Sequence, residues 1–228
     1  ANFAAEMRTA ALFLAFMAGI IGAGAQTLAE RMVSAGLVDV TDAARNIMVD
    51  LMYARDDNFT ATLLYDDGLD RAFLHPDAAE ALGRAAALLA AEKPGYKLKI
   101  CDAARPMSVQ RRMYDAVRGT PKAGYVGNPA RGGGLHNYGL AVDITITGPD
   151  GRELDMGTQV DHLGPLANID REDLMVRQGR LTRAQVDNRR LLRRVMTGAG
   201  FRTLRTEWWH FQMCTRSQAS RRYRRLDF

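Results

Sequence analysis

The sequence has few cysteines, few histidines and no second long apolar run, and each shortage narrows the possibilities. Two cysteines among 228 residues exclude a disulfide-dense scaffold, and a chain of this length can bury a sizeable core without one. Cys101 and Cys214 each end a predicted strand, so they can pair in an oxidising compartment or remain two separate buried thiols. No internal repeat or linker interrupts residues 26–228, which predicts one domain.

The one long apolar run, Ala10 to Ile21, is short for a membrane span, which needs about 20 residues. A basic start at Met7-Arg8 precedes it and small residues follow it at 23–25, as in a secretory signal peptide. We predict that residues 1–25 are a signal peptide with a short upstream remnant; an uncleaved anchor is the alternative. The mature protein is then expected to be secreted, in the periplasm, without stable membrane insertion after cleavage.

The charge balance is basic, with a net charge of +5 and a pI of about 9.5. Surplus positive charge favours anionic surroundings such as acidic lipid or wall polymer. The charge alone does not show whether the protein has any such partner. The arginines between 216 and 225, in the C-terminal tail, are typical of a solvated terminus. We predict no nucleic-acid partner, and the sequence leaves the oligomeric state open.

Apolar periodicity and turn residues predict helices and strands mixed without regular alternation, which favours an α+β fold over a doubly wound sheet. Pro76 suits a first helical position, and Ser108 can cap a second helix. Thr182 and Gln185 form a capping box for a third. We predict helices at 76–92, from 108 and at 182–196, and strands at 46–53, 96–100, 140–146 and within 201–214.

A glycine-rich stretch, residues 131–146, carries His136 and, seven positions later, Asp143. Imidazole nitrogen and carboxylate oxygen both bind zinc at about 2.0–2.2 Å, so two ligands of one ion lie within about 4 Å of each other. Seven extended residues would span ~23 Å, so the chain must turn back between the two, and Gly139 can adopt the positive φ that such a turn needs. On spacing alone, a solvated aspartate beside a lone loop histidine is the commoner arrangement.

A second short segment, from Glu207 to His210, can complete a metal site. On a straight strand these two side chains would point to opposite faces, yet the aromatic residues between and after them favour a strand. We therefore expect a turn or bulge at Glu207, with His210 in the strand proper. Glu207 would then act as a general base beside the metal, and Trp208 and Trp209 would either wall the pocket or belong to the core.

Arg105 lies in the loop after a predicted strand. Attack of water on an amide carbonyl builds negative charge on oxygen, and a fixed guanidinium stabilises that charge. The alternative is a surface arginine held by Asp102. Of the two remaining histidines, His75 precedes a predicted helix and is expected to be structural, and His162 has no assigned role.

Together these segments resemble the zinc D-alanyl-D-alanine dipeptidases, the family that includes the vancomycin-resistance dipeptidase. The resemblance extends from about Val49 to His210, and its specific signals are His-x6-Asp followed by Glu-x-x-His, with the arginine loop upstream. The matching stretches are Val49-Asp-Leu-Met-Tyr-Ala54, Asp57-Asn-Phe-Thr60, Leu98-Lys-Ile-Cys-Asp-Ala-Ala-Arg-Pro106, His136-Asn-Tyr-Gly-Leu-Ala-Val-Asp143, Glu153-Leu-Asp-Met-Gly-Thr158, Asn188-Arg-Arg-Leu-Leu192 and Glu207-Trp-Trp-His210.

The resemblance implies hydrolysis of the dipeptide D-Ala-D-Ala by an enzyme with one Zn2+ per chain. It implies Glu207 as the base, Arg105 as the stabiliser of the transition state, and Asp155 as the acceptor of the free amino group of the dipeptide. It also implies a small antiparallel sheet flanked by helices, as in D,D-carboxypeptidases and the hedgehog signalling domain. The implied zinc ligands are His136, Asp143 and His210.

One position departs from the family pattern. Members commonly carry serine two residues before the first histidine, where this chain has Gly134, so a hydroxyl contact to the substrate amine is missing. Two rival functions stay open: a D,D-carboxypeptidase or endopeptidase acting on peptidoglycan, and a zinc-bearing binding domain without catalysis. Asp155 argues against the first, because longer chains have no free amine there. Glu207 and Arg105 argue against the second.

Overall fold

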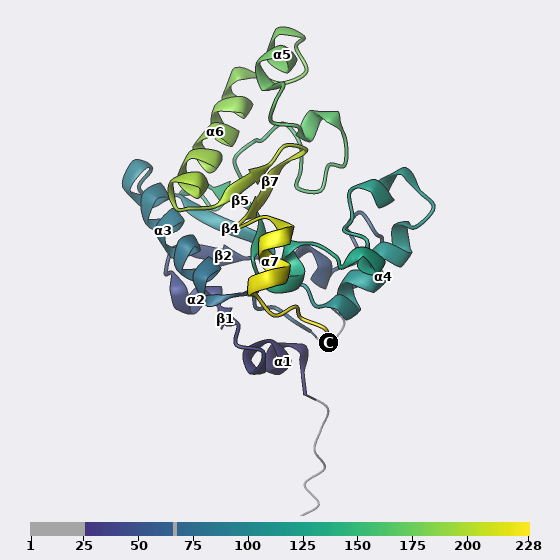
Figure 1. Ribbon diagram of the computed structural model, residues 1–228. Helices are drawn as coiled ribbons and strands as arrows, with labels where there is room; N and C mark the ends of the chain where they lie inside the picture. Colours follow the sequence, from purple (N-terminus) through teal and green to yellow (C-terminus); the bar gives the residue numbers. More distant parts are fainter. Residues whose placement is uncertain (1–25, 66–67) are drawn as a thin grey trace, which may run out of the picture.

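The computed structural model describes residues 26–65 and 68–228, so the predicted signal peptide at 1–25 lies outside the described residues (Figure 1). The main sheet has five strands in the order β2-β4-β5-β7-β6, and only the β2–β4 pair is parallel. Helices flank this sheet, which confirms the predicted α+β fold with a small, mostly antiparallel sheet. The strands are β2 (Ile47–Val49), β4 (Lys97–Asp102), β5 (Ala141–Thr147), β6 (Arg202–Leu204) and β7 (Glu207–Gln212), with a separate antiparallel pair of β1 (Val38–Asp39) and β3 (Phe73–Leu74).

Two long helices, α3 (Pro76–Glu92) and α6 (Arg183–Gly198), pack against each other along one side of the molecule (Figure 1). Their starts confirm the sequence predictions, since α3 begins at a proline and α6 has the capping box of Thr182 and Gln185. Helix α3 turns a face of alanine and leucine towards β4. Each fully buried leucine on this face contributes about 1.5–3 kcal/mol to folding, which holds the helix and the sheet together.

Helix α4 (Met107–Val117) is capped differently from the prediction. We expected Ser108 to cap it with its side chain, but Ser108 lies inside the first turn, and Pro106 at the N-cap makes no side-chain hydrogen bond. The backbone N–H groups of Met107 and Ser108 instead donate to the main-chain oxygens of Leu226 and Phe228, at 2.8 and 3.0 Å. The C-terminal tail therefore satisfies the first N–H groups of α4, which a helix cannot satisfy itself.

Strand β5 lies between β4 and β7, and all seven of its residues are buried. The predicted alternation along this strand therefore separates two buried faces, one made of aliphatic side chains and one that includes Asp143. In the sheet register Asp143 lies opposite Asp102 on β4 and opposite His210 on β7. The register alone brings two predicted metal ligands, Asp143 and His210, and the buried Asp102 side by side on adjacent strands.

Shorter helices and turns connect these elements, and the predicted strand at 46–53 is cut short because the chain turns into a 3-10 helix at 52–54. Cys101 on β4 and Cys214 after β7 are free thiols, and β5 separates their strands. Within the described residues no helix has the length and apolarity to cross a membrane. The other helices are α1 (Leu28–Ser34), α2 (Val40–Ala43), α5 (Glu172–Arg177) and α7 (Arg216–Arg222), and the 3-10 turns are η1 (Met52–Ala54), η2 (Pro121–Gly124), η3 (Pro129–Arg131), η4 (Leu135–Tyr138) and η5 (Pro165–Ala167).

Candidate metal centre

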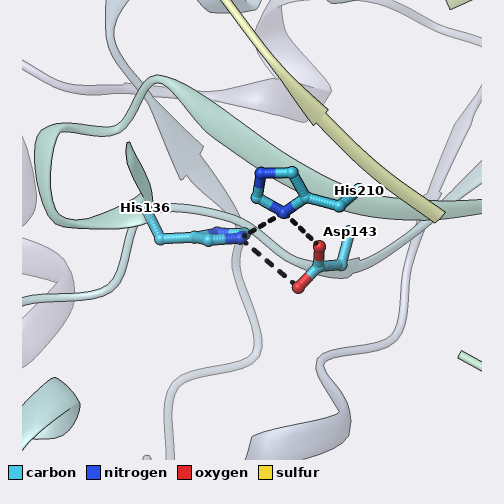
Figure 2. A group of neighbouring side chains, drawn as sticks. All are labelled: His136, Asp143 and His210. Carbon is cyan, nitrogen blue, oxygen red and sulfur yellow. Dashed lines mark hydrogen bonds and ion pairs between the residues drawn. The ribbon is translucent and has the colours of Figure 1, made fainter. Parts of the chain in front are cut away.

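The side chains of His136, Asp143 and His210 converge at one buried point (Figure 2). His136 Nε2 lies 3.2 Å from His210 Nδ1 and 3.4 Å from Asp143 Oδ2. Asp143 Oδ1 lies 3.0 Å from His210 Nδ1. A tetrahedral ion with bonds of about 2.0–2.1 Å would hold its ligand atoms ~3.3 Å apart. The spacing of these three donor atoms therefore fits one small divalent cation.

The turn predicted between the first two ligands is present. His136 lies in η4, and Gly139 ends this turn with a φ of 65°, a conformation that glycine adopts without steric cost. The chain then enters β5, which presents Asp143 from the neighbouring strand of the sheet. This fold-back brings two candidate ligands that are seven residues apart close enough to share one ion.

A hydrogen bond orients the His136 ring, and neighbouring groups determine the charge of Asp143. His136 Nδ1–H donates to the main-chain oxygen of Ala103 at 2.7 Å, which leaves Nε2 free for a metal. Burial alone would raise the pKa of Asp143, but the neighbouring His136 and His210 hold it far below its usual range. Asp143 is therefore an anion in the folded protein, as a metal ligand must be.

Glu207 reaches the same site because strand β7 bulges. Thr203 of β6 pairs with Phe211, but the next residue, Leu204, pairs with Glu207. Residues 208–210 of β7 therefore have no partner on β6 and form a bulge between these two pairs. The bulge turns Glu207 to the face of His210, and Glu207 Oε2 lies 4.0 Å from His210 Nδ1. Burial raises the pKa of Glu207 to about 7, although His210 partly opposes this. A carboxyl group with this pKa can accept and release a proton near neutral pH.

Arg105 is buried and held in one orientation. Its Nε donates to Asp102 Oδ2 at 3.0 Å and its Nη1 to Gln110 Oε1 at 3.1 Å. Its Nη2 lies 3.9 Å from Asp143 Oδ2, and the guanidinium stacks over the ring of Tyr53 at 5.1 Å. Burial would lower the pKa of Arg105, but Asp102 and the other acidic groups nearby raise it above its usual value. The guanidinium is a fixed cation beside the cluster, and Asp102 holds it there in the buried site.

These groups surround one small cavity of about 180 Å³. Apolar side chains, among them Phe59 and Leu163, cover part of its wall, and Gly134 is also a lining residue. A Cβ atom at Gly134 would meet no other atom within 4 Å. The polar residues that line the cavity include Tyr53, Arg105, Asp143, Asp161, Glu207 and His210, with His136 and the two glutamines Gln110 and Gln212.

Asp155, the predicted amine acceptor, is not among the residues that line this cavity. Its carboxylate is exposed and accepts hydrogen bonds from Gln185 Nε2 and the N–H of Gly157. Asp161 does line the cavity, beside Asp143 and Glu207, and it accepts a 2.5 Å hydrogen bond from the hydroxyl of Tyr53. Sequence reasoning missed it, although a second carboxylate six residues after Asp155 was the available signal.

The backbone of Asp161 adopts a φ of 62°, which is uncommon for a residue other than glycine and tolerated best by Asp and Asn. Burial and, after it, the negative charge of the nearby Asp143 together raise the pKa of this carboxyl group to about 7. A cationic ligand in the cavity would relieve both effects. Asp161 is therefore placed to receive a positive charge.

The other residues singled out by the sequence have structural places. Trp208 and Trp209 are almost fully buried and do not line the cavity, so they belong to the core. His75 is the N-cap of α3 and accepts the N–H of Asp77, as its predicted structural role requires. His162 is exposed and does not line the cavity.

Fold and site together define a class of protein: an α+β domain whose cavity combines a metal-binding cluster with a titratable carboxyl group and a fixed guanidinium, the chemistry of a peptidase. Residues 33–226 match the family model described as D-ala-D-ala dipeptidase. The chain therefore belongs to the D-Ala-D-Ala dipeptidase family, as the sequence resemblance indicated.

Known relatives cover most of the chain. It is similar to the D-alanyl-D-alanine dipeptidase of Escherichia coli, with 33% identity over 177 residues that cover 78% of this chain and 84% of the relative. The D-alanyl-D-alanine dipeptidase of Streptomyces coelicolor is 31% identical over 193 residues, covering 76% of this chain and 89% of its own length. That of Enterococcus faecalis is 26% identical over 197 residues, covering 78% and 91%.

Proposed function

We propose that this protein is a zinc-dependent dipeptidase that hydrolyses D-Ala-D-Ala, with one Zn2+ per chain. One observation carries the proposal: the buried cluster of His136, Asp143 and His210 shares a single small cavity with Glu207 and Arg105. Three protein ligands of nitrogen and oxygen type are the usual set of a catalytic zinc, which keeps a fourth position open. The names of the relatives support D-Ala-D-Ala as the substrate.

Bound zinc would supply Lewis acidity, which polarises a carbonyl group and activates water at neutral pH. Glu207 would take the proton from the attacking water and pass it to the leaving amine, because its raised pKa suits both steps. Arg105 would stabilise the negative charge that develops on the carbonyl oxygen. Its contacts with Asp102 and Gln110 support this role, since a guanidinium held in place needs no reorganisation when the charge appears.

The free amino group of the substrate would bind Asp161, in place of Asp155. Asp161 lines the cavity and Asp155 does not. An anionic group so near the metal cluster favours a substrate whose ammonium lies close to the scissile bond, which is true of a dipeptide and untrue of a long peptidoglycan stem. The small volume of the cavity favours the same choice.

We also propose that the protein acts in the periplasm. The support is the sequence of residues 1–25, with its basic start, apolar run and small residues. Fractionation of cells that express the full chain tests this proposal. Recovery of a shortened protein in the periplasmic fraction is expected, and retention of the full-length chain in the cytoplasm would contradict it.

The variant Glu207→Gln tests the mechanism. Because it removes the base and leaves the three ligands, we expect turnover of D-Ala-D-Ala to fall by about 10²–10⁴-fold while the zinc content stays at one per chain. Measurements are steady-state kinetics and elemental analysis, with and without a chelator. Glu153→Gln is the matched control, since Glu153 is exposed and pairs with Lys99 outside the cavity.

Three results would contradict the proposal. Near-normal activity of Glu207→Gln would exclude Glu207 as the general base. Activity that survives complete removal of metal would exclude zinc as the catalytic metal. A stem pentapeptide cleaved in preference to D-Ala-D-Ala would favour a D,D-carboxypeptidase.

A further inference from the structure

The side chain of Gln212 contacts the outer edge of a metal ligand. Gln212 lies two residues after His210 on β7, so both side chains point to the same face of the strand, while Trp209 and Phe211 point into the core. Gln212 Oε1 lies 3.1 Å from His210 Nε2, and Gln212 also lines the cavity. This is the ring nitrogen that faces away from the cluster.

A second hydrogen bond determines which end of the amide faces the histidine. Gln212 Nε2 donates to the main-chain oxygen of Cys214 at 3.2 Å. A carbonyl oxygen can only accept, so the NH2 end of the amide belongs there and the oxygen end faces His210. An oxygen acceptor at 3.1 Å requires a hydrogen on His210 Nε2. When the ring is neutral, its lone pair is then on Nδ1, the atom that faces Asp143 and His136.

We propose that Gln212 is a positioning residue that holds His210 as a metal ligand through Nδ1; this inference rests on the proposed metal site. The two histidines are oriented through opposite nitrogens. His136 is held by the backbone oxygen of Ala103, which no substitution removes. His210 is held by a side chain, so its orientation depends on the residue at position 212. Partners of this kind commonly change metal affinity by 10–100-fold.

Zinc affinity of the full chain tests the proposal without reference to turnover. Gln212→Leu removes the acceptor at nearly the same volume, and we expect the zinc dissociation constant, measured by competition with a chromogenic chelator, to rise by about 10–100-fold. Gln212→Glu keeps an acceptor oxygen, and we expect it to bind zinc at least as tightly as the wild type. Met213→Leu, a conservative change beside the site, is expected to leave the affinity unchanged.

A second measurement reports the hydrogen bond itself. In zinc-loaded protein labelled with 15N-histidine, the Nε2–H proton of His210 should be protected from exchange in the wild type and in Gln212→Glu. It should exchange rapidly in Gln212→Leu. Heteronuclear NMR observes both cases, and melting temperatures exclude a general loss of structure.

Two results would overturn the inference: wild-type zinc affinity in Gln212→Leu, or Gln212→Glu binding zinc no better than Gln212→Leu. The proposed function fails separately. If zinc-loaded wild-type protein does not hydrolyse D-Ala-D-Ala, the enzyme activity is excluded, but the comparison of zinc affinities still decides the role of Gln212.

Discussion

Among single residues, Arg105 shows how a buried charge is held in one position. Its guanidinium contacts Asp102 and Gln110, and its backbone N–H donates to the main-chain oxygen of His136 at 2.9 Å. The arginine loop and the metal-ligand turn are therefore joined directly. Asp102 is fully buried and also accepts the hydroxyl of Tyr65 at 2.7 Å, so its charge is shared between two donors.

The substitution Arg105→Lys tests whether this geometry matters beyond the charge. Lysine keeps the positive charge but cannot reach Asp102 and Gln110 with a planar fork. We expect kcat/KM for D-Ala-D-Ala to fall by about 10²–10³-fold, with bound zinc unchanged. Arg84→Lys, on the exposed face of α3, is the control. Equal kinetics for the two variants would remove Arg105 from the mechanism.

Among elements, the turn η4 is the one on which the candidate metal centre depends. It carries His136, ends at Gly139 and leads straight into β5 with Asp143. At Gly139 the backbone conformation and the space are both restrictive. A Cβ atom there would lie 2.9 Å from the backbone nitrogen of His75 and 2.9 Å from Leu37 Cδ2.

Replacement of Gly139 by alanine should therefore destabilise the protein. A positive φ costs a non-glycine residue about 1–3 kcal/mol, and the close contacts add to this cost. Urea denaturation measures the loss. Gly36→Ala is the matched control, because Gly36 has a φ of 85° but nothing within 4 Å of a Cβ. If both variants lose the same stability, close packing at Gly139 is not important.

Strand β7 is the second element that builds the site, through its bulge. Without the extra residues Glu207 would point to the core side with Trp209, by simple alternation. The aromatic side chains of Trp208 and Trp209 occupy the core and so commit the strand to one register. The bulge interrupts the pairing between β6 and β7, and it places the carboxyl group of Glu207 in the cavity.

At the scale of the whole molecule, the two ends of the described chain are both attached to the domain. The C-terminal tail caps α4, and the N–H of Leu226 donates to the main-chain oxygen of Asn137 in η4 at 2.8 Å. The N-terminal region is attached through Asp39, a buried carboxylate that caps α2, accepts the hydroxyl of Thr41 and pairs with Arg71 at 2.5 Å.

Asp39 should make stability depend on pH. Burial would raise its pKa, but the hydrogen bonds from Thr41 and the charge of Arg71 lower it below the usual value of 3.8. Its contribution is therefore fully present above about pH 4, the unfolded pKa, and is lost as pH falls through the lower folded pKa. We expect Asp39→Asn to lower the melting temperature at pH 7 and to differ less from the wild type as pH falls below 4.

Thermal unfolding between pH 7 and pH 2 measures this difference. Asp115→Asn is the control, since Asp115 is exposed and its ion pair with the exposed Arg118 is long at 3.9 Å. A difference between wild type and Asp39→Asn that stays constant across this range would show that the Asp39 carboxylate contributes through shape and not through charge.

The sequence by itself determined the parts that depend on near neighbours. The bounds of α3 and α6 follow from a proline, a capping box and apolar periodicity within each segment. The turn at Gly139 followed because seven extended residues would hold His136 and Asp143 too far apart to share one ion. The bulge at Glu207 followed because a regular strand would point Glu207 and His210 to opposite faces. The family followed from short motifs in a specific order.

Only the tertiary structure decided which distant groups meet. It places Asp161 in the cavity and Asp155 outside it, because both lie in irregular chain where no period predicts direction. It assigns the cap of α4 to the tail, more than 100 positions away in the chain, and sets Gln212 against His210. Local sequence governs conformation over a few residues, whereas such encounters depend on strand register and packing across the whole chain.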